Sequence, residues 1–264
     1  MTNAADGDLV MSEITVTFGG LTALDEVSLS VNSGEIVGVI GPNGAGKTTL
    51  FNVICGFVRA DSGSLSYRGK ALRRHQPHHL AKLGIARTLQ GVGLWQGMSV
   101  LENVMAGGQA KVKADFASAT LGLWRSSREE VRIRQQALAL MDELRIAQYA
   151  RTRPGALPYG MQKRASLARA LMAEPTLLLL DEPASGLSSD DMDELSGLLK
   201  TLRTKMGVLL VEHHMDLVMS TCDRLIVLNF GRVIANGTPA EVQANPEVTT
   251  AYLGQDVSAV GREG

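Results

Sequence analysis

The sequence predicts an α/β protein with a mostly parallel sheet that is covered on both faces. Short apolar runs are separated by helical patterns along the chain, which is typical of strands buried on both sides. One of these runs, Ile36–Ile40, leads into a glycine-rich turn and then a helical pattern, the context of a phosphate-binding loop. With 264 residues, of which 45% are apolar, the chain can bury a core of this kind.

The chain is expected to open with antiparallel β structure. Leu9–Thr17 and Val27–Val31 alternate apolar and polar residues with a period of two, and Gly19-Gly20 marks a turn between them. The core strands are expected wherever short apolar runs recur. These runs are Ile36–Ile40, Ile85–Leu89, Leu177–Leu180, Val208–Val211 and Leu225–Leu228.

A helical insertion interrupts the sheet. Between residues 91 and 158 β-branched residues are scarce, and Val100–Met105 and Arg128–Leu144 have helical periodicity. We interpret this stretch of roughly sixty residues as a subdomain grafted onto the sheet. The tail is expected to hold a short helix at Ala240–Ala244 and to be disordered after Gly254.

Composition and charge argue against several classes of protein. The formal net charge of −1 argues against wrapping nucleic acid as the main task. No run approaches 18 consecutive apolar residues, and the first residues lack the basic and apolar regions of a signal peptide, so we expect a soluble cytoplasmic protein. Cys55 and Cys222 lie far apart, on or beside apolar elements, which indicates two reduced, packed thiols.

Residues 41–48 match the phosphate-binding pattern G-x-x-x-x-G-K-[ST] at every fixed position. A glycine-rich turn between strand and helix can point successive backbone N–H groups into one concavity, and the helix N-terminus adds the positive end of its dipole. The Lys47 ammonium can reach the terminal phosphates, and the Thr48 hydroxyl can ligate Mg²⁺. The expected phosphate-binding residues are Gly41, Pro42, Asn43, Gly44, Ala45, Gly46, Lys47, Thr48 and Thr49.

Two acids follow the buried run Leu177–Leu180, at the carboxyl end of a strand, where ligands of open α/β sheets bind. Neighbouring carboxylates cannot both be buried without compensation, so water, Mg²⁺ or a catalytic role should stand opposite them. We expect Asp181 to hold Mg²⁺ and Glu182 to polarise the water that attacks a γ-phosphate.

Three further segments complete a resemblance to a known family. Residues 157–164, Leu-Pro-Tyr-Gly-Met-Gln-Lys-Arg, open a helix before the acidic strand, Gln90 ends the run that begins at Ile85, and Val211-Glu212-His213 ends another strand. With the phosphate loop and the acidic strand, their order and spacing resemble an ATP-binding-cassette (ABC) ATPase over nearly the whole chain. The resemblance implies a RecA-like P-loop NTPase core with an antiparallel β arm and an ABC-specific helical subdomain.

The resemblance implies four regions in the chain. The first part of the ATP-binding core, with the antiparallel β arm, spans residues 1–91, and the helical subdomain spans residues 92–157. The second part of the core spans residues 158–245, and a C-terminal tail spans residues 246–264.

The resemblance also implies roles for single residues. Phe18 stacks on adenine, although a core aromatic on a β-hairpin is the alternative. Tyr159 and Gly160 belong to the helix start that covers the nucleotide of the opposite subunit, so one chain holds half of each site. Gln90 senses Mg²⁺ and the attacking water, and His213 contacts the γ-phosphate. The implied catalytic residues are Glu182, His213 and Gln90, and the implied metal ligands are Thr48, Gln90 and Asp181, with ATP and Mg²⁺ as cofactors.

The sequence departs from the family pattern at the helix start. The usual serine is Pro158, the next glycine is Tyr159, and the following glutamine is Met161. Pro158 has neither a hydroxyl nor a backbone N–H, so one γ-phosphate contact must be lost or taken over by Gly160 and neighbouring amides. In the following loop the usual aspartate is Ser188, which weakens the carry-over of its contact across the subunit interface.

Several polar clusters have two interpretations. His214 follows His213, but the family order of Glu, His, any residue and Met favours His213. A cluster at His75, His78 and His79 could hold a metal, yet Pro77 breaks the helical spacing and a solvated surface cluster is favoured. The pairs Arg73-Arg74 and Lys163-Arg164 are interpreted as solvated helix faces.

Several stretches resemble one branch of the family, the ATPase subunits of branched-chain amino-acid importers. They include residues 84–90, 211–215 and 235–239. This resemblance implies a head-to-tail dimer with an identical or homologous ATPase, two transmembrane permease subunits, an extracytoplasmic solute-binding protein and no nucleic acid. The expected location is the cytoplasmic face of the membrane, as a peripheral subunit.

Three other functions fit the sequence less well. A soluble cassette ATPase acting on nucleic acid or ribosomes is the alternative, but the chain has no long coiled coil or second cassette and its charge is near neutral. A small-molecule kinase has no use for the helix start at residues 157–160. A GTPase is disfavoured because no Asn-Lys-x-Asp pattern occurs in the sequence.

Overall fold

A computed structural model describes residues 8–88, 91–108 and 125–252 of the chain. Its centre is a six-stranded sheet in which the strand order is β10-β9-β3-β8-β7-β6. The pairs β9-β3, β3-β8, β8-β7 and β7-β6 are parallel, while β10 runs antiparallel to β9 at the edge. The strands are β3 (Ile36–Ile40), β6 (Ile85–Arg87), β7 (Leu177–Asp181), β8 (Gly207–Val211), β9 (Arg224–Asn229) and β10 (Arg232–Gly237).

A second, antiparallel sheet of four strands is built mainly from the start of the chain. Its order is β2-β1-β4-β5, and the β1–β2 hairpin turns at Gly19-Gly20 with Phe18 opposite Leu21. This sheet confirms the predicted antiparallel opening. The strands are β1 (Leu9–Phe18), β2 (Leu21–Val31), β4 (Ser62–Tyr67) and β5 (Lys70–Ala71).

The large sheet is buried on both faces because its strands place successive side chains on opposite sides. In β3, Val37 and Val39 belong to a core shared with β1, β2 and α1 (Lys47–Cys55). Ile36 and Ile40 belong to a second core, shared with the helical insertion and α7 (Ser189–Arg203). The same alternation occurs in β7, β8 and β9, so the predicted sheet covered on both faces is confirmed.

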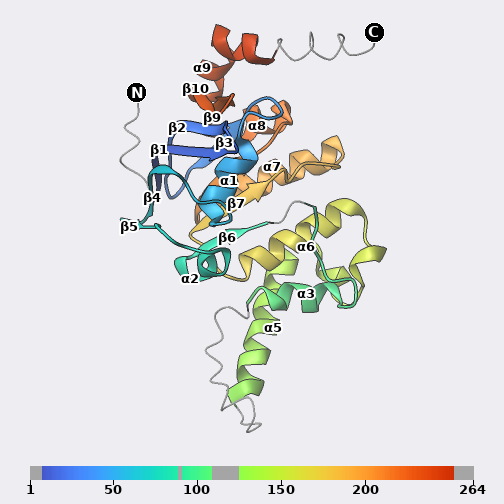
Figure 1. Ribbon diagram of the computed structural model, residues 1–264. Coiled ribbons are helices and arrows are strands. Elements are labelled where there is room, and N and C mark those ends of the chain that lie inside the picture. Colours follow the sequence, from blue (N-terminus) through green and yellow to red (C-terminus); the bar gives the residue numbers. More distant parts are fainter. Residues whose placement is uncertain (1–7, 89–90, 109–124, 253–264) are drawn as a thin grey trace.

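The predicted helical insertion is present in the described residues. Figure 1 shows α3 (Val100–Ala106) and α5 (Arg125–Glu143) in green, gathered with α6 (Tyr159–Leu171) on the side of the molecule away from β1 and β2. The start of α3 has a capping box in which Ser99 and Glu102 exchange hydrogen bonds, a device that stabilises a helix by about 1 kcal/mol.

The remaining helices are short connections or cover the sheet. They are α2 (Leu80–Leu83), α8 (Met215–Thr221), α9 (Pro239–Gln243) and the 3-10 turns η1 (Pro77–His79), η3 (Ala147–Tyr149) and η4 (Pro154–Ala156). Within the described ranges, none of the helices combines the length and the hydropathy that a bilayer crossing requires. Both thiols, Cys55 and Cys222, are free and buried, as expected.

Some strands were not predicted from the sequence. The strands β4, β5 and β10 carry serine, glycine or charged residues in place of a continuous apolar run, and all three lie at or near sheet edges where one face meets solvent. The strand β6 ends at Arg87, before Thr88, although the strand was expected to reach Leu89. Leu89 and Gln90 lie outside the described residues, as do the residues after 252, where disorder was expected after Gly254.

Candidate functional site

The carboxyl ends of β3, β8 and β7 lie side by side, because these strands are neighbours in the parallel part of the sheet. The loop after β3 spans residues 41–46 and leads to Lys47 at the start of α1, the strand β7 ends at Asp181, and β8 is followed by Glu212 and His213. Three segments that are far apart in the sequence therefore meet at one sheet edge, as predicted.

The loop after β3 needs glycine at two close approaches. Gly41 has φ 151°, and a Cβ there would lie 2.1 Å from the Leu228 carbonyl oxygen. Gly46 has φ 104° and caps α1, and a Cβ there would lie 2.6 Å from the Ala23 carbonyl oxygen. The backbone thus turns tightly against β2 and β9 before the helix begins. Thr48 is exposed and Thr49 is half-buried in the first turn of α1.

The Lys47 ammonium is held over the same loop. Its Nζ donates to the carbonyl oxygens of Gly41 at 2.6 Å and Pro42 at 2.8 Å. Burial lowers the pKa of Lys47, and the nearby Glu182 carboxylate opposes that shift. The Lys47 ammonium therefore lies beside the loop that leads into the N-terminus of α1. The positive charge, the loop N–H groups and the helix dipole together favour binding of an anion there.

Asp181 ends β7 with only 9% of its surface exposed. Burial raises the pKa of this carboxyl, against the attraction of the Arg87 and Lys163 cations, while Glu182 and Glu212 add to the rise. The Arg87 guanidinium lies over the rings of Phe51 (5.2 Å) and Phe57 (4.8 Å). A further cation in front of Asp181 would relieve the cost of its burial.

Glu182 has a backbone conformation that is rare outside glycine, with φ 47°. Its N–H donates to the Val211 carbonyl oxygen at 2.9 Å, and its own carbonyl oxygen accepts from Lys163 Nζ at 3.2 Å. Strain of this kind persists only where several contacts hold it, and it concentrates at functional sites. The turn directs the Glu182 side chain, which is 31% exposed, toward His213, whose Nδ1 lies 3.9 Å from Glu182 Oε1.

The histidine pair after β8 divides into an exposed and a half-buried ring. His213 has 52% of its side chain exposed, while His214 is tied to the buried Glu212 carboxylate by a 2.8 Å hydrogen bond from Nδ1. The exposed ring, His213, faces Glu182 and is the one free to meet a ligand. The geometry therefore favours His213 over His214 as the ring that meets a ligand.

The first turn of α6 packs against the loop that follows β7. A Cβ on Gly186 would lie 2.9 Å from the Tyr159 ring, and a Cβ on Gly160 would lie 2.9 Å from Asp191 Oδ1. Pro158 is the N-cap residue and offers no side-chain cap. Ser188 caps α7 instead, accepting from the Asp191 N–H at 3.2 Å. The helix start expected to cover a partner's nucleotide thus lies beside the loop that carries Glu182.

The interpretation of Lys163 and Arg164 as a solvated helix face is wrong. Lys163 points toward the acids, and burial lowers its pKa. The Arg164 side chain is only 16% exposed, pairs with Glu194 and donates to the Leu144 carbonyl oxygen. Sequence periodicity could not reveal this, because α6 is enclosed on one side by the insertion and on the other by α7.

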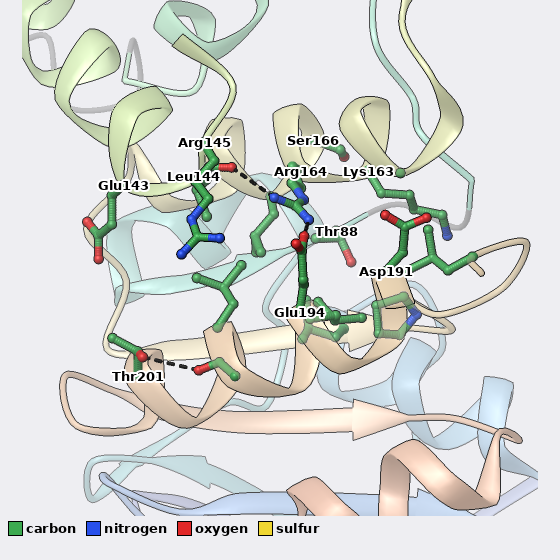
Figure 2. A pocket seen from close by; sticks show the side chains of 18 of the residues that line it. Thr88, Glu143, Leu144, Arg145, Lys163, Arg164, Ser166, Asp191, Glu194 and Thr201 are labelled. Atoms are coloured by element: carbon green, nitrogen blue, oxygen red, sulfur yellow. Dashed lines mark hydrogen bonds and ion pairs between the residues drawn. The ribbon is translucent and has the colours of Figure 1, made fainter. Parts of the chain in front are cut away.

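Between α6 and α7 lies a cavity of about 350 Å³. Figure 2 shows Arg164 reaching across it from α6 to Glu194 on α7, with Leu144 beside it and Asp191 and Lys163 at one end. Asp181 and Gly160 also line this cavity. The cavity therefore lies between α6, α7 and the residues that end α5, next to the acidic strand end.

Other predicted residues have simple outcomes. Phe18 is 50% exposed at the tip of the first hairpin, so it is not a core aromatic. Gln90 lies outside the described residues. His75 bonds through Nε2 to the Ile54 carbonyl oxygen at 2.8 Å, while His78 and His79 are in η1. Glu212, which the sequence analysis gave no role, is fully buried at the centre of the site.

The residues at this edge fit a magnesium nucleotide. The positive-φ glycines and Lys47 form an anion cradle at the start of a nine-residue helix. The exposed Thr48 hydroxyl and the buried Asp181 carboxyl are oxygen donors of the type that Mg²⁺ prefers. The glycine loop and Lys47 therefore suit phosphate groups, and the Thr48 and Asp181 oxygens suit a cation bound to those phosphates.

Two family models match the chain. Residues 24–185 match the model described as ABC transporter, which covers more than half of the chain. Residues 232–258 match the model described as Branched-chain amino acid ATP-binding cassette transporter. The first match spans the phosphate loop, the insertion and the acidic strand, and the second begins at β10.

Curated proteins and solved structures are similar over nearly the full length. The chain is 37% identical over 249 residues to the high-affinity branched-chain amino acid transport ATP-binding protein BraF of Pseudomonas aeruginosa, covering 94% of this chain and 98% of that protein. It is 36% identical to the LivG protein of the same description from Escherichia coli K12, with the same coverage. A nucleotide-free ATP-binding cassette from an ABC transporter superposes with a TM-score of 0.81 at 31% identity, covering 94% of this chain and 99% of that one.

Proposed function

Because the chain belongs to the ATP-binding-cassette transporter family, we propose that it is the ATP-hydrolysing subunit of an importer for branched-chain amino acids or similar small polar solutes. The observation that carries this proposal is the meeting of Lys47, Asp181 and Glu182 at neighbouring strand ends beside an exposed His213. Relatives at 36–37% identity are named as ATP-binding proteins of high-affinity branched-chain amino acid transport.

Nucleotide binding follows from the loop at residues 41–49. The N–H groups of this loop and of the start of α1 would hold the phosphates, and Lys47 Nζ would exchange two carbonyl partners for phosphate oxygens. A similar cassette, at 30% identity and a TM-score of 0.81, has been solved in its ADP conformation, covering 95% of this chain and all of that one. Phe18, exposed at the hairpin tip, would stack on the adenine ring.

A magnesium ion would be held by Thr48 and Asp181, with Gln90 as a further ligand proposed from the sequence. It would supply positive charge against the phosphate oxygens, which lowers the cost of developing negative charge. Its presence would also offset the burial that raises the pKa of Asp181.

Hydrolysis would depend on positioning and charge. Glu182 would accept a proton from the attacking water, His213 would donate a hydrogen bond to the γ-phosphate, and Gln90 would help to orient the water. The strained Glu182 backbone fixes the direction of its side chain, so that little reorganisation is needed during reaction.

We propose that two such subunits close head to tail over two ATP molecules. Tyr159 and Gly160 of one subunit would cover the nucleotide of the other, although Pro158 provides no N–H there. The ATPase would act with two permease subunits and an extracytoplasmic solute-binding protein, as a peripheral subunit on the cytoplasmic face of the membrane. The family assignment and the net charge of −1 disfavour the alternative of a nucleic-acid or ribosome ATPase.

The test is solute uptake by the reassembled transporter. The chain would be purified with two permease subunits and a second ATPase subunit, identical or homologous, and reconstituted in vesicles with the binding protein. We expect ATP-dependent uptake of leucine, isoleucine or valine, with release of inorganic phosphate. Phosphate release that responds to nucleic acid and not to any solute would contradict the proposal.

A further inference from the structure

The Glu212 side chain is a completely buried carboxylate at the centre of the site. It follows β8, the strand between β3 with its phosphate loop and β7 with its acids, and its exposed fraction is 0%. Its backbone N–H bonds to the Val39 carbonyl oxygen of β3 at 3.3 Å. A charged group at such a place is costly unless hydrogen bonds satisfy it.

Four N–H groups from two loops satisfy this carboxylate. Oε1 accepts from the Ala184 N–H at 2.8 Å, in the loop after β7. Oε2 accepts from the N–H groups of His213 at 2.7 Å and His214 at 3.0 Å, and from His214 Nδ1 at 2.8 Å. Burial alone would raise the pKa of Glu212, but these hydrogen bonds hold it below its ordinary value.

All four partners are donors, so the site requires a group that only accepts. A carboxylate has two acceptor oxygens, whereas a glutamine would turn an NH₂ group toward either Ala184 or the two histidines. Two other roles do not fit this arrangement. Glu212, His213 and His214 lie close enough to suggest a metal site, but Oε2, the oxygen beside both histidines, already accepts three hydrogen bonds. The side chain also has no exposed surface at which a water could meet it as a general base.

The two loops joined by Glu212 carry the two groups expected to act on the γ-phosphate. Ala184 lies two residues after Glu182, whose φ of 47° must be held by its surroundings. His213 itself donates its backbone N–H to Glu212, so the same carboxylate fixes the backbone position from which the exposed imidazole extends.

We propose that Glu212 is a positioning residue that sets Glu182 and His213 at a fixed spacing for ATP hydrolysis. This role rests on the proposed function, since it acts through the two residues that would perform the chemistry. Glu212 has no exposed surface at which it could touch a nucleotide, so the phosphate loop should bind ATP normally without it.

The test is Glu212→Gln in the full chain, assembled with its companion subunits. We expect kcat for ATP hydrolysis to fall about 100-fold, the loss that a displacement of about 1 Å can cause. The Kd for ATP should change less than about threefold, because the loss is confined to the transition state.

A matched control is Asp223→Asn, at the opposite end of β3. Asp223 also accepts a backbone N–H, from Ile36 at 2.8 Å, and pairs with Arg203, but it lies outside the proposed site. This variant should lose thermal stability with unchanged kcat. A fall in kcat equal to that of Glu212→Gln would show that any loosened strand end slows hydrolysis, and would overturn the positioning role.

Glu212→Asp covers the case in which the glutamine variant does not fold. It keeps the charge, but its side chain is one methylene shorter and cannot reach Ala184 and the histidines together, so we expect a comparable fall in kcat with ATP affinity kept. Wild-type kcat in this variant would overturn the role of Glu212 alone. A wild-type complex that binds ATP but never hydrolyses it would instead overturn the proposed function and this role with it.

Discussion

The loops at the carboxyl edge of the sheet and the interface between α6 and α7 are held together in different ways. At the sheet edge, backbone hydrogen bonds and the buried Glu212 carboxylate join the loops after β7 and β8. Between α6 and α7 there is a 350 Å³ cavity crossed by Arg164 with its partners Glu194 and Leu144. The residues proposed to act on ATP are therefore joined by direct hydrogen bonds, whereas α6 and α7 are joined across a cavity by the Arg164 side chain.

The largest expected effect comes from Glu182→Gln at the sheet edge. Removing the base should lower ATP hydrolysis by the assembled complex about 10³-fold while ATP binding is kept. A closed dimer should also persist longer with ATP, which sizing chromatography would detect. Wild-type hydrolysis in this variant would show that the base lies elsewhere.

A methyl group on the phosphate loop should weaken ATP binding. In Gly46→Ala the new Cβ would lie 2.6 Å from the Ala23 carbonyl oxygen, at a φ of 104° that alanine disfavours by about 1–2 kcal/mol. We expect ATP affinity to fall about tenfold or more, since each 1.4 kcal/mol is tenfold. Calorimetric titration measures this, and unchanged affinity would mean that the loop is not the phosphate site.

Asp181→Asn should stabilise the metal-free protein and stop hydrolysis. Burial raises the folded pKa of Asp181, so its ionised form destabilises the fold. This penalty is absent below the ordinary pKa of about 3.9, which applies to the unfolded chain. It grows as the pH rises through the raised pKa of the folded protein. In EDTA at pH 7.5 the variant should melt about 2–4 °C higher for each kcal/mol relieved.

The advantage of Asp181→Asn should shrink as the pH is lowered toward 4, where both proteins carry a neutral side chain. Melting curves at several pH values test this. An advantage that stays constant with pH would show that the gain does not come from the carboxyl charge.

Gly197→Ala tests the interface between α6 and α7. Gly197 lies within α7 at the edge of the cavity, and a Cβ there would meet nothing within 4 Å. Alanine should stabilise the helix by about 1 kcal/mol without reducing hydrolysis. Differential scanning calorimetry would measure the gain, and a loss of stability would mean that this interface is tighter than the cavity indicates.

The smallest effect is expected from Lys205→Ala, which breaks the ion pair with Glu143 at the end of α5. Both side chains are more than a third exposed, and exposed pairs contribute less than about 1 kcal/mol. Urea denaturation should detect little change. A larger loss would make this pair a principal tie between insertion and core.

Much of this organisation could be predicted from the sequence, because strong local patterns coincide with the sheet. The runs at 36–40 and 177–180 form strands of the large sheet. The glycines of the phosphate loop have positive φ angles, which other residues disfavour. The strands β4 and β10, which lie next to or at a sheet edge, were missed because one face of each meets solvent and the apolar pattern is weaker there.

The contacts between segments could not be predicted. Glu212 appears in the sequence as one acid before a histidine, and only the strand order places its oxygens between two loops. The positions of Lys163 and Arg164 likewise depend on which helices enclose α6. Periodicity describes one element at a time, whereas these roles arise from the distance between elements.

The central claim is that the loop at residues 41–49 binds ATP through Lys47. Equilibrium titration of the purified chain with a fluorescent ATP analogue tests it most directly, with Lys205→Ala as a lysine control outside the site. We predict saturable binding that unlabelled ATP competes away, the same affinity in Lys205→Ala, and an affinity at least about tenfold weaker in Lys47→Ala. Equal affinity in the wild type and Lys47→Ala would contradict the account.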